Sequence, residues 1–158
     1  MVTSKNTLSA KNLEALGAER LAELLIEIST GNAAAKRRLR LELAGAQSPG
    51  EVTKEIRKRL TTVARSQSLV DWQNRRILVE DLETQRRAIV DQVAKADPAE
   101  ALELIWRFMT LANPVFGRCD DSSGTVIGIF HAACRDLGEI ARRRSSPQKC
   151  SQSTPSAL

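Results

Sequence analysis

The sequence lacks tyrosine and holds only two tryptophans, three phenylalanines and one histidine. Aromatic residues are therefore not interleaved with the basic ones in the way that lets proteins stack on bases. The three cysteines, Cys119, Cys134 and Cys150, are an odd number without the spacing of a disulfide framework or a zinc finger. No apolar run approaches the roughly 18 residues of a membrane span, and the first twelve residues hold no apolar segment typical of a signal peptide. These absences favour a soluble protein of a reducing compartment, which we expect to be the cytoplasm.

The residues that are abundant, Ala, Leu, Glu and Arg, are good helix formers. Strict apolar/polar alternation of useful length does not occur, and neither does an Asn-Gly or Asp-Gly hairpin turn. We therefore predict an all-α fold of about seven helices, arranged as a bundle or as a short helical-repeat array. The predicted organisation is a flexible N-terminus at 1–8, a helical domain at 9–142 and a disordered basic, Ser-rich tail at 143–158.

The strongest helical pattern covers residues 71–96. Leu78, Leu82, Ile89 and Val93 fall on one side of a 3.6-residue wheel. A continuous helix of this length is a rod of roughly 39 Å. Because the apolar stripe on such a rod is narrow, we expect other helices to cover it.

Start signals predict where several other helices begin. Ser9 is a candidate N-cap, and Ser48 and Asp97 each precede a proline at the first helical position. The last two signals lie 49 residues apart, a separation that would also suit a helical repeat. Gly45 is expected to end the helix before Ser48, and the final helix is expected at about 123–142.

Charge is distributed unevenly. Residues 33–65 carry nine basic and three acidic residues, whereas 96–140 carry three basic and seven acidic ones. The basic segment is a candidate surface for phosphates of nucleic acid or for an acidic protein partner. It can equally be a solvated face, or can pair with the acidic later part of the chain, and it has no recognition-helix signature. The candidate residues are Lys36, Arg37, Arg38, Arg40, Lys54, Arg57, Lys58 and Arg65.

Two arginines, Arg75 and Arg86, fall within the apolar stripe of the long helix on either side of Leu82. A charge that points toward a core must be paired or must extend toward water. The two guanidinium groups could line an anion pocket, or could pair internally with acids of the last helices.

A weak metal-like set consists of Cys119, Asp120, His131 and Cys134, but it includes no CxxC pair and no second histidine. Segment 120–123 places two acids beside two hydroxyls, and the same residues are good N-caps. His131 would lie roughly 12 Å of helix rise beyond Ser123, too far for a direct hydrogen bond. We therefore expect no metal, no cofactor and no catalytic residues, and we lean against an enzyme.

Three stretches carry a resemblance to a known family: the segment LSAKNLEALG at 8–17, the predicted helix at 99–112 and the loop CDDSSG at 119–124. Over roughly residues 8–141 the chain resembles an uncharacterised bacterial family, many of whose members come from alphaproteobacteria, catalogued as domain of unknown function 6880. The resemblance implies helical structure and a cytoplasmic bacterial origin, and it carries over no catalytic residue. Members of the family are often longer, so the low-complexity end of this chain could be a truncated or frameshifted terminus.

The function that fits these observations best is a non-enzymatic helical protein-interaction module with an unknown protein partner. The alternative is a nucleic-acid-binding protein that uses the basic surface of residues 36–65. A membrane partner is not expected, and the sequence leaves the oligomeric state open.

Overall fold

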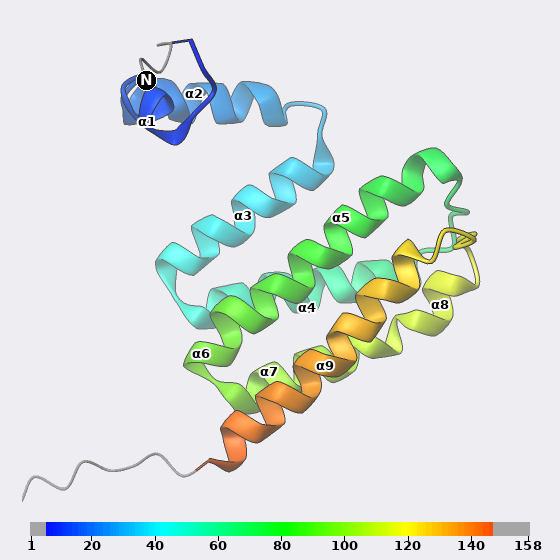
Figure 1. Cartoon of the computed structure of the whole chain (residues 1–158). Coiled ribbons are helices and arrows are strands. Elements are labelled where there is room, and N and C mark those ends of the chain that lie inside the picture. Colours follow the sequence, from blue (N-terminus) through cyan, green and yellow to red (C-terminus); the bar gives the residue numbers. More distant parts are fainter. Residues whose placement is uncertain (1–5, 147–158) are drawn as a thin grey trace, which may run out of the picture. The chain divides into compact units, whose positions relative to one another are not determined.

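A computed structural model of the chain describes residues 6–146. Within that range every element is a helix and there is no strand, which confirms the predicted all-α class (Figure 1). The elements are α1 (Ala10–Glu14), α2 (Ala18–Ser29), α3 (Ala33–Gln47), α4 (Pro49–Arg65), α5 (Trp72–Ala88), the π-helix η1 (Ile89–Val93), α6 (Ala94–Ala96), α7 (Pro98–Thr110), α8 (Ala112–Phe116) and α9 (Thr125–Ser145). Counting α5, η1 and α6 as one rod, and α7 with α8 as one broken helix, gives seven helices in this range.

The chain divides into two compact units, Met1–Arg40 and Leu41–Leu158, which we describe one at a time. In the first unit α1 packs against α2. The predicted N-cap at Ser9 is confirmed, because its hydroxyl accepts a hydrogen bond from the Asn12 backbone N–H at 3.3 Å. Gly17 joins the two helices with φ +84°, a left-handed conformation that glycine adopts without strain.

The second unit holds the hydrophobic core. The rod formed by α5, η1 and α6 packs against α7, and α4 and α9 each contact both the rod and α7. Leu82 and Ile89 of the rod, Ile56 of α4, and Leu104 and Phe108 of α7 are fully buried. The long rod is therefore covered by other helices, as its narrow stripe requires.

The predicted caps of this unit are confirmed. Ser48 accepts from the Glu51 N–H at 3.3 Å, and Asp97 accepts from the Ala99 and Glu100 N–H groups at 3.1 Å. A proline follows each cap at the start of its helix, where its missing N–H costs nothing.

Three helix boundaries differ from the sequence prediction. Gly45 does not end α3, which continues to Gln47, and the Gln92 side chain occupies the space that a Cβ at Gly45 would need. The last helix begins at Thr125 and runs to Ser145, so residues 143–145, predicted as the start of a tail, are helical. The remainder of the predicted tail from 147 onward, and residues 1–5 of the predicted flexible N-terminus, lie outside the described range.

The break between α7 and α8 lies at Leu111, three residues before Pro114. Proline has no N–H to bond the carbonyl four residues earlier, and its ring crowds that carbonyl, so the helix changes direction there. The short α8 leads to a loop in which Cys119 forms an isolated parallel bridge with Val70. No described helix is long and apolar enough to cross a membrane.

Candidate interaction surfaces

The candidate basic residues belong to both units. Lys36, Arg37, Arg38 and Arg40 occupy the first half of α3, and the other four residues lie on α4. Lys36, Arg38 and Arg40 are exposed and make no ion pair with any residue in the described range, whereas Arg37 is half-buried. The first half of α3 therefore presents three unneutralised cations.

On α4 the cations have different surroundings. Arg57 forms ion pairs with Glu100 and, at 3.3 Å, with Glu103 of α7. Its hydrogen bond to Glu100 raises the pKa of Arg57 despite partial burial. Lys54 lies 3.8 Å from Glu51, one turn earlier on its own helix. Arg57 thus ties α4 to α7, so that the basic segment pairs with the acidic later part of the chain at this position.

Lys58 and Arg65 are exposed and have no ion-pair partner within residues 6–146. Arg59, next to Lys58, behaves differently and reaches Asp81 of α5 at 2.6 Å. On α4, Arg57 and Arg59 therefore form ion pairs with other helices, whereas Lys58 and Arg65 are exposed to water.

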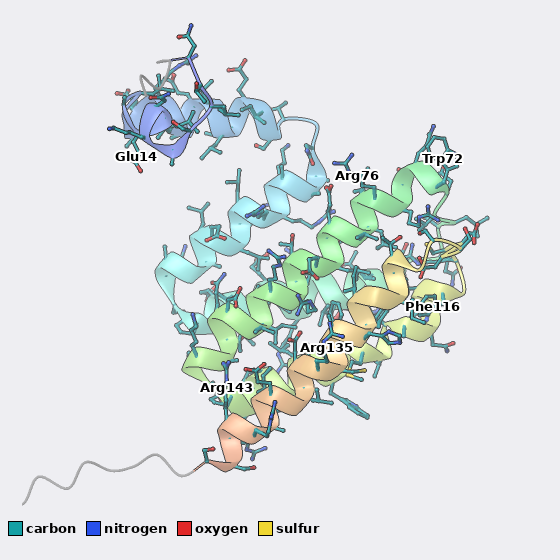
Figure 2. The ribbon with its side chains drawn as sticks, in the orientation of Figure 1. Glu14, Trp72, Arg76, Phe116, Arg135 and Arg143 are labelled. Carbon is teal, nitrogen blue, oxygen red and sulfur yellow. The ribbon has the colours of Figure 1, made fainter. Side chains whose placement is uncertain are left out.

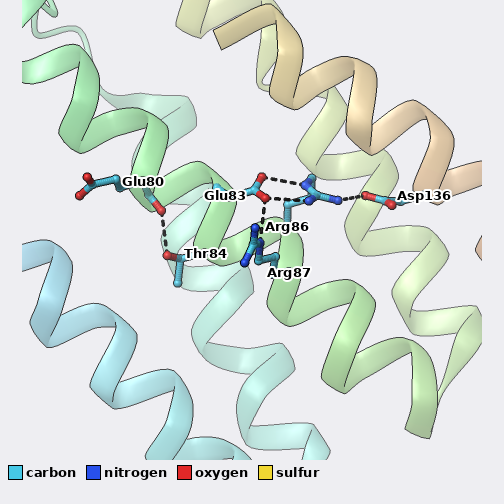
Figure 3. Close-up of polar contacts among 6 residues, drawn as sticks. All are labelled: Glu80, Glu83, Thr84, Arg86, Arg87 and Asp136. Atoms are coloured by element: carbon cyan, nitrogen blue, oxygen red, sulfur yellow. Dashed lines mark hydrogen bonds and ion pairs between the residues drawn. The ribbon is translucent and has the colours of Figure 1, made fainter. Parts of the chain in front are cut away.

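Arg86 belongs to α5, and its side chain reaches toward α9 (Figure 3). It donates two hydrogen bonds to the Glu83 carboxylate, at 2.8 and 2.9 Å, and a third to Asp136 of α9. Arg87 also donates to Glu83, at 2.8 Å. The hydrogen bonds that Arg86 donates to Glu83 and Asp136 raise the pKa of Arg86, and the bond from Arg86 lowers the pKa of Glu83.

Arg75 has a different environment. Its guanidinium donates to the backbone carbonyl of Asp120 at 2.8 Å. Arg75 and Arg86 lie eleven positions apart, about 16 Å along a helix. The structure therefore does not bring the two arginines to one point, and each is bound to groups of the segment from 120 to 136.

Two buried polar residues of α5 were absent from the sequence prediction. Asp81 is buried and paired with Arg59, and Gln85 is buried with its side-chain oxygen unbonded within the described part of the chain. Gln85 occupies the apolar stripe between Leu82 and Ile89, a position that the same periodicity identifies. The sequence signal that could have identified Gln85 is a polar residue at a position where the helical period predicts an apolar one.

The two acids of the 120–123 loop both bind backbone N–H groups. The Asp121 carboxylate accepts from the N–H groups of Val126 and Ile127 at 2.9 and 2.8 Å, at the start of α9. Asp120 accepts from the Ser122 N–H at 3.1 Å. The capping interpretation therefore holds for Asp121, whereas Asp120 closes a turn within the loop.

The metal-like residues are dispersed over different environments. Cys119 is partly buried in the loop, and burial raises the pKa of its thiol. His131 and Cys134 are exposed on α9. Among residues 6–146, no three His, Cys, Asp or Glu side chains lie close enough together to hold a metal ion.

Large apolar side chains are exposed on both units. The two tryptophans are among them. Trp72 is 74 % exposed at the start of α5 (Figure 2), and Trp106 of α7 is 61 % exposed. Within the described part of the first unit, residues 6–40, no hydrophobic side chain is buried. The exposed large hydrophobic residues of that unit are Leu8, Leu13, Leu16, Leu25, Ile26 and Ile28.

Comparison with known proteins returns one family. The model of a family of unknown function, DUF6880, matches residues 3–152. No curated protein and no solved structure matches the chain.

Proposed function

The chain belongs to this family of unknown function, and we propose, from its own surfaces, that it is a non-enzymatic protein-interaction module. The observation that carries the proposal is the uncovered apolar face of α1 and α2. Leu25 is 50 % and Ile28 is 70 % exposed, and both belong to the apolar stripe of α2.

An amphipathic helix gains most of its stability from burying its apolar stripe. Leu21 and Leu24, on the same stripe, are half-buried, whereas Leu25 and Ile28 near its end are left in water. Covering the exposed part of each would contribute about 1 kcal/mol or more. A contiguous set of such side chains, bordered by charged residues, is typical of a surface that another protein covers.

The polar groups that could suggest an enzyme have other roles that support the same proposal. Asp120 and Asp121 bind backbone N–H groups, and Arg86 is bound by two carboxylates. The two aspartates order the loop and the start of α9, and the Arg86 cluster joins α5 to α9, so the proposal turns to the exposed helix faces.

The proposal is tested by introducing a photo-crosslinking amino acid at Ile28 in the native cells. We expect a discrete adduct with a protein, and we expect Leu25→Glu in the same chain to abolish it. The matched control places the same amino acid at Lys58, which is exposed on α4 and outside the proposed surface. Equal adduct patterns from Ile28 and Lys58 would rule the proposal out.

A second candidate function is nucleic-acid binding through the basic residues of segment 36–65. The observation that favours it is the set of three exposed, unneutralised cations on α3, Lys36, Arg38 and Arg40. If each neutralises one phosphate of a duplex, log Kd should change by about 2 to 3 per decade of salt. Replacing all three by alanine should remove that dependence.

The control for this second test uses Arg135, Arg142 and Arg144, three exposed cations of α9 with no ion-pair partner in the described range. Their replacement by alanine should leave the salt slope unchanged. Titration of labelled duplex and single-stranded probes at low salt is the measurement, and no binding by the wild-type protein would dismiss this candidate.

A further inference from the structure

Trp106 points outward from α7 and belongs to an apolar stripe. Leu104 and Phe108, which are fully buried, lie two residues before and two residues after Trp106, about 160° from it around the helix. Leu102 and Met109, four residues before Trp106 and three after it, share its side of α7 and are half-buried. The indole of Trp106, 61 % exposed, therefore protrudes from lower apolar neighbours.

A second exposed stripe runs along α9. Four exposed residues at spacings of four, three and four share one side of this helix: Ile127, His131, Cys134 and Gly138. Asp136, which binds Arg86 of α5, lies two residues from both Cys134 and Gly138, about 160° from them around the helix. The stripe of α9 therefore faces away from α5.

The two stripes meet on the outside of the second unit. Glu100 and Arg107 bind residues of α4, and Leu102 and Met109 each lie two residues from one of them, so the stripe of α7 faces away from α4. α7 and α9 pack side by side and run antiparallel (Figure 1). Because α7 has α4 on one side and α9 on the other, its stripe borders α9, and the stripe of α9 borders α7 for the same reason. We call the two stripes together the α7–α9 face.

The charge left unneutralised at this face is positive. All four acidic residues of α7 and α9 form ion pairs with arginines, Glu100 and Glu103 with Arg57, Asp136 with Arg86, and Glu139 with Arg143. Arg135 (Figure 2) and Arg142 are exposed and have no ion-pair partner within residues 6–146. They lie one turn after His131 and Gly138, so both border the stripe of α9.

We propose that the α7–α9 face binds the surface of an anionic lipid bilayer, with Trp106 among the lipid headgroups and Arg135 and Arg142 beside their negative charges. The protein lies on the bilayer and does not span it. Tryptophan is enriched at the boundary between membrane and water because its ring is amphipathic, and arginines near an anionic leaflet add electrostatic attraction. This inference goes beyond the proposed function and departs from the sequence-based expectation that the chain has no membrane partner.

Three features favour a lipid surface as the occupant. A second copy that presented the same face would bring unpaired cations together, which opposes pairing. The ring of Trp106 protrudes above half-buried neighbours, so a protein partner would need a pocket shaped to receive it, whereas a headgroup layer deforms around it. Arg135 and Arg142 lie seven residues apart, about 10 Å along α9, and lipid charges can move laterally to reach both.

Fluorescence of Trp106 tests the binding directly. Trp72→Phe in the full chain leaves Trp106 as the sole tryptophan. The probe is a phosphatidylcholine vesicle that contains about one third phosphatidylserine, at low salt, and the comparison is a vesicle of phosphatidylcholine alone. We expect the anionic vesicles to shift the emission of Trp106 to the blue and to protect it from iodide, and the neutral vesicles to change both much less.

Substitutions on and off the face locate the contact. Arg135→Ala with Arg142→Ala should lower the partition coefficient, from co-sedimentation with the anionic vesicles, by about tenfold or more. Lys58→Ala with Arg65→Ala removes the same charge from exposed residues of α4 and should change it by no more than about threefold. Trp106→Ala should lower the partition coefficient by about fivefold or more, because the buried apolar area is lost.

Circular dichroism of each variant should match the wild type, because every substituted side chain is exposed. A wild-type chain that does not bind the anionic vesicles overturns the proposal, as does binding that leaves the emission of Trp106 unchanged or that the α4 variant weakens equally. If the vesicles are not bound and a photo-crosslinker at Trp106 captures an acidic protein in the native cells, the face binds a protein and the lipid proposal fails. The crosslink from Ile28 tests the proposed function on the first unit, so the two results can fail separately.

Discussion

Arg86 of α5 donates a hydrogen bond to Asp136 of α9, a residue 50 positions later in the chain. Glu83, one turn before Arg86, binds the other edge of the same guanidinium. The side chain of Arg86 is only 15 % exposed and lies within an apolar stripe. Carboxylates on both sides of its guanidinium neutralise the charge there. This three-residue cluster joins α5 and α9, two helices that η1, α6, α7 and α8 separate in the chain.

Replacing Arg86 by alanine should destabilise the fold by about 2 to 3 kcal/mol, because Asp136 and Glu83 lose the charge that neutralises them. Urea denaturation followed by circular dichroism measures the change. Arg87 is the matched control, since it is 68 % exposed and binds Glu83 alone. Arg87→Ala should cost less than about 0.5 kcal/mol, and equal costs for the two variants would contradict the assigned role.

The stabilisation from the cluster of Glu83, Arg86 and Asp136 should decrease at low pH. The hydrogen bond from Arg86 lowers the pKa of Glu83 in the folded state below the ordinary glutamate value of 4.5. The stabilisation is therefore fully present above pH 4.5 and is lost as the pH falls through the lowered folded pKa. Urea denaturation at a series of pH values from 7 to 3 measures the loss, and Glu83→Gln should flatten the profile in its acid part. A Glu83→Gln profile parallel to the wild type would contradict this prediction.

The start of α9 depends on Asp121. Asp121→Ala removes the acceptor of two backbone N–H groups, Val126 and Ile127, and should cost about 1 to 2 kcal/mol. Thermal unfolding gives the difference. Ser122→Ala in the same loop should be close to neutral, because only its backbone N–H bonds to Asp120. A Ser122 variant as unstable as the Asp121 variant would place the stabilisation elsewhere in the loop.

Tryptophan fluorescence reports on the two exposed rings. Trp72 and Trp106 both lie largely in water, so the native emission should already be near that of free tryptophan. Unfolding should shift it little, and iodide should quench both residues in the folded protein. Single Trp→Phe variants separate the two signals. A blue-shifted native emission that iodide does not reach would mean that a partner or a second copy covers the ring.

Truncating a buried leucine should lower the free energy of unfolding much more than truncating an exposed one. Leu82→Ala removes a fully buried side chain and should cost about 2 to 5 kcal/mol, with the loss of a cooperative urea transition at the upper end. Leu43→Ala removes a side chain that is mostly in water and should cost less than about 0.5 kcal/mol in the monomer. Comparable losses for both would contradict the assigned faces of α3 and α5.

Much of the fold follows from local rules. Ser9, Ser48 and Asp97 cap helices because a short polar side chain there satisfies a free N–H, whatever the rest of the chain does. The period of Leu78, Leu82 and Ile89 likewise identifies the buried side of α5 without knowledge of its neighbours. Both signals depend on residues within a few positions of each other.

Other features depend on distant residues. Gly45 lies inside α3, and the side chain that occupies the space beside it is Gln92, 47 positions later; the π-helix at 89–93 has no signature in its five residues. Arg57 and Arg86 look alike in the sequence as cations on helices, yet each is neutralised by acids more than 40 positions away. For the candidate surfaces, the basic segment was recognisable, but the pairing of some of its members was not.

The sequence by itself determined the helical class, the caps and the buried stripes, because 3.6-residue periodicity and capping are interactions within one turn. The tertiary structure alone decided which charges are neutralised across helices and which apolar side chains stay in water. Ion pairs and burial depend on which helices lie next to each other, and no local pattern specifies that arrangement.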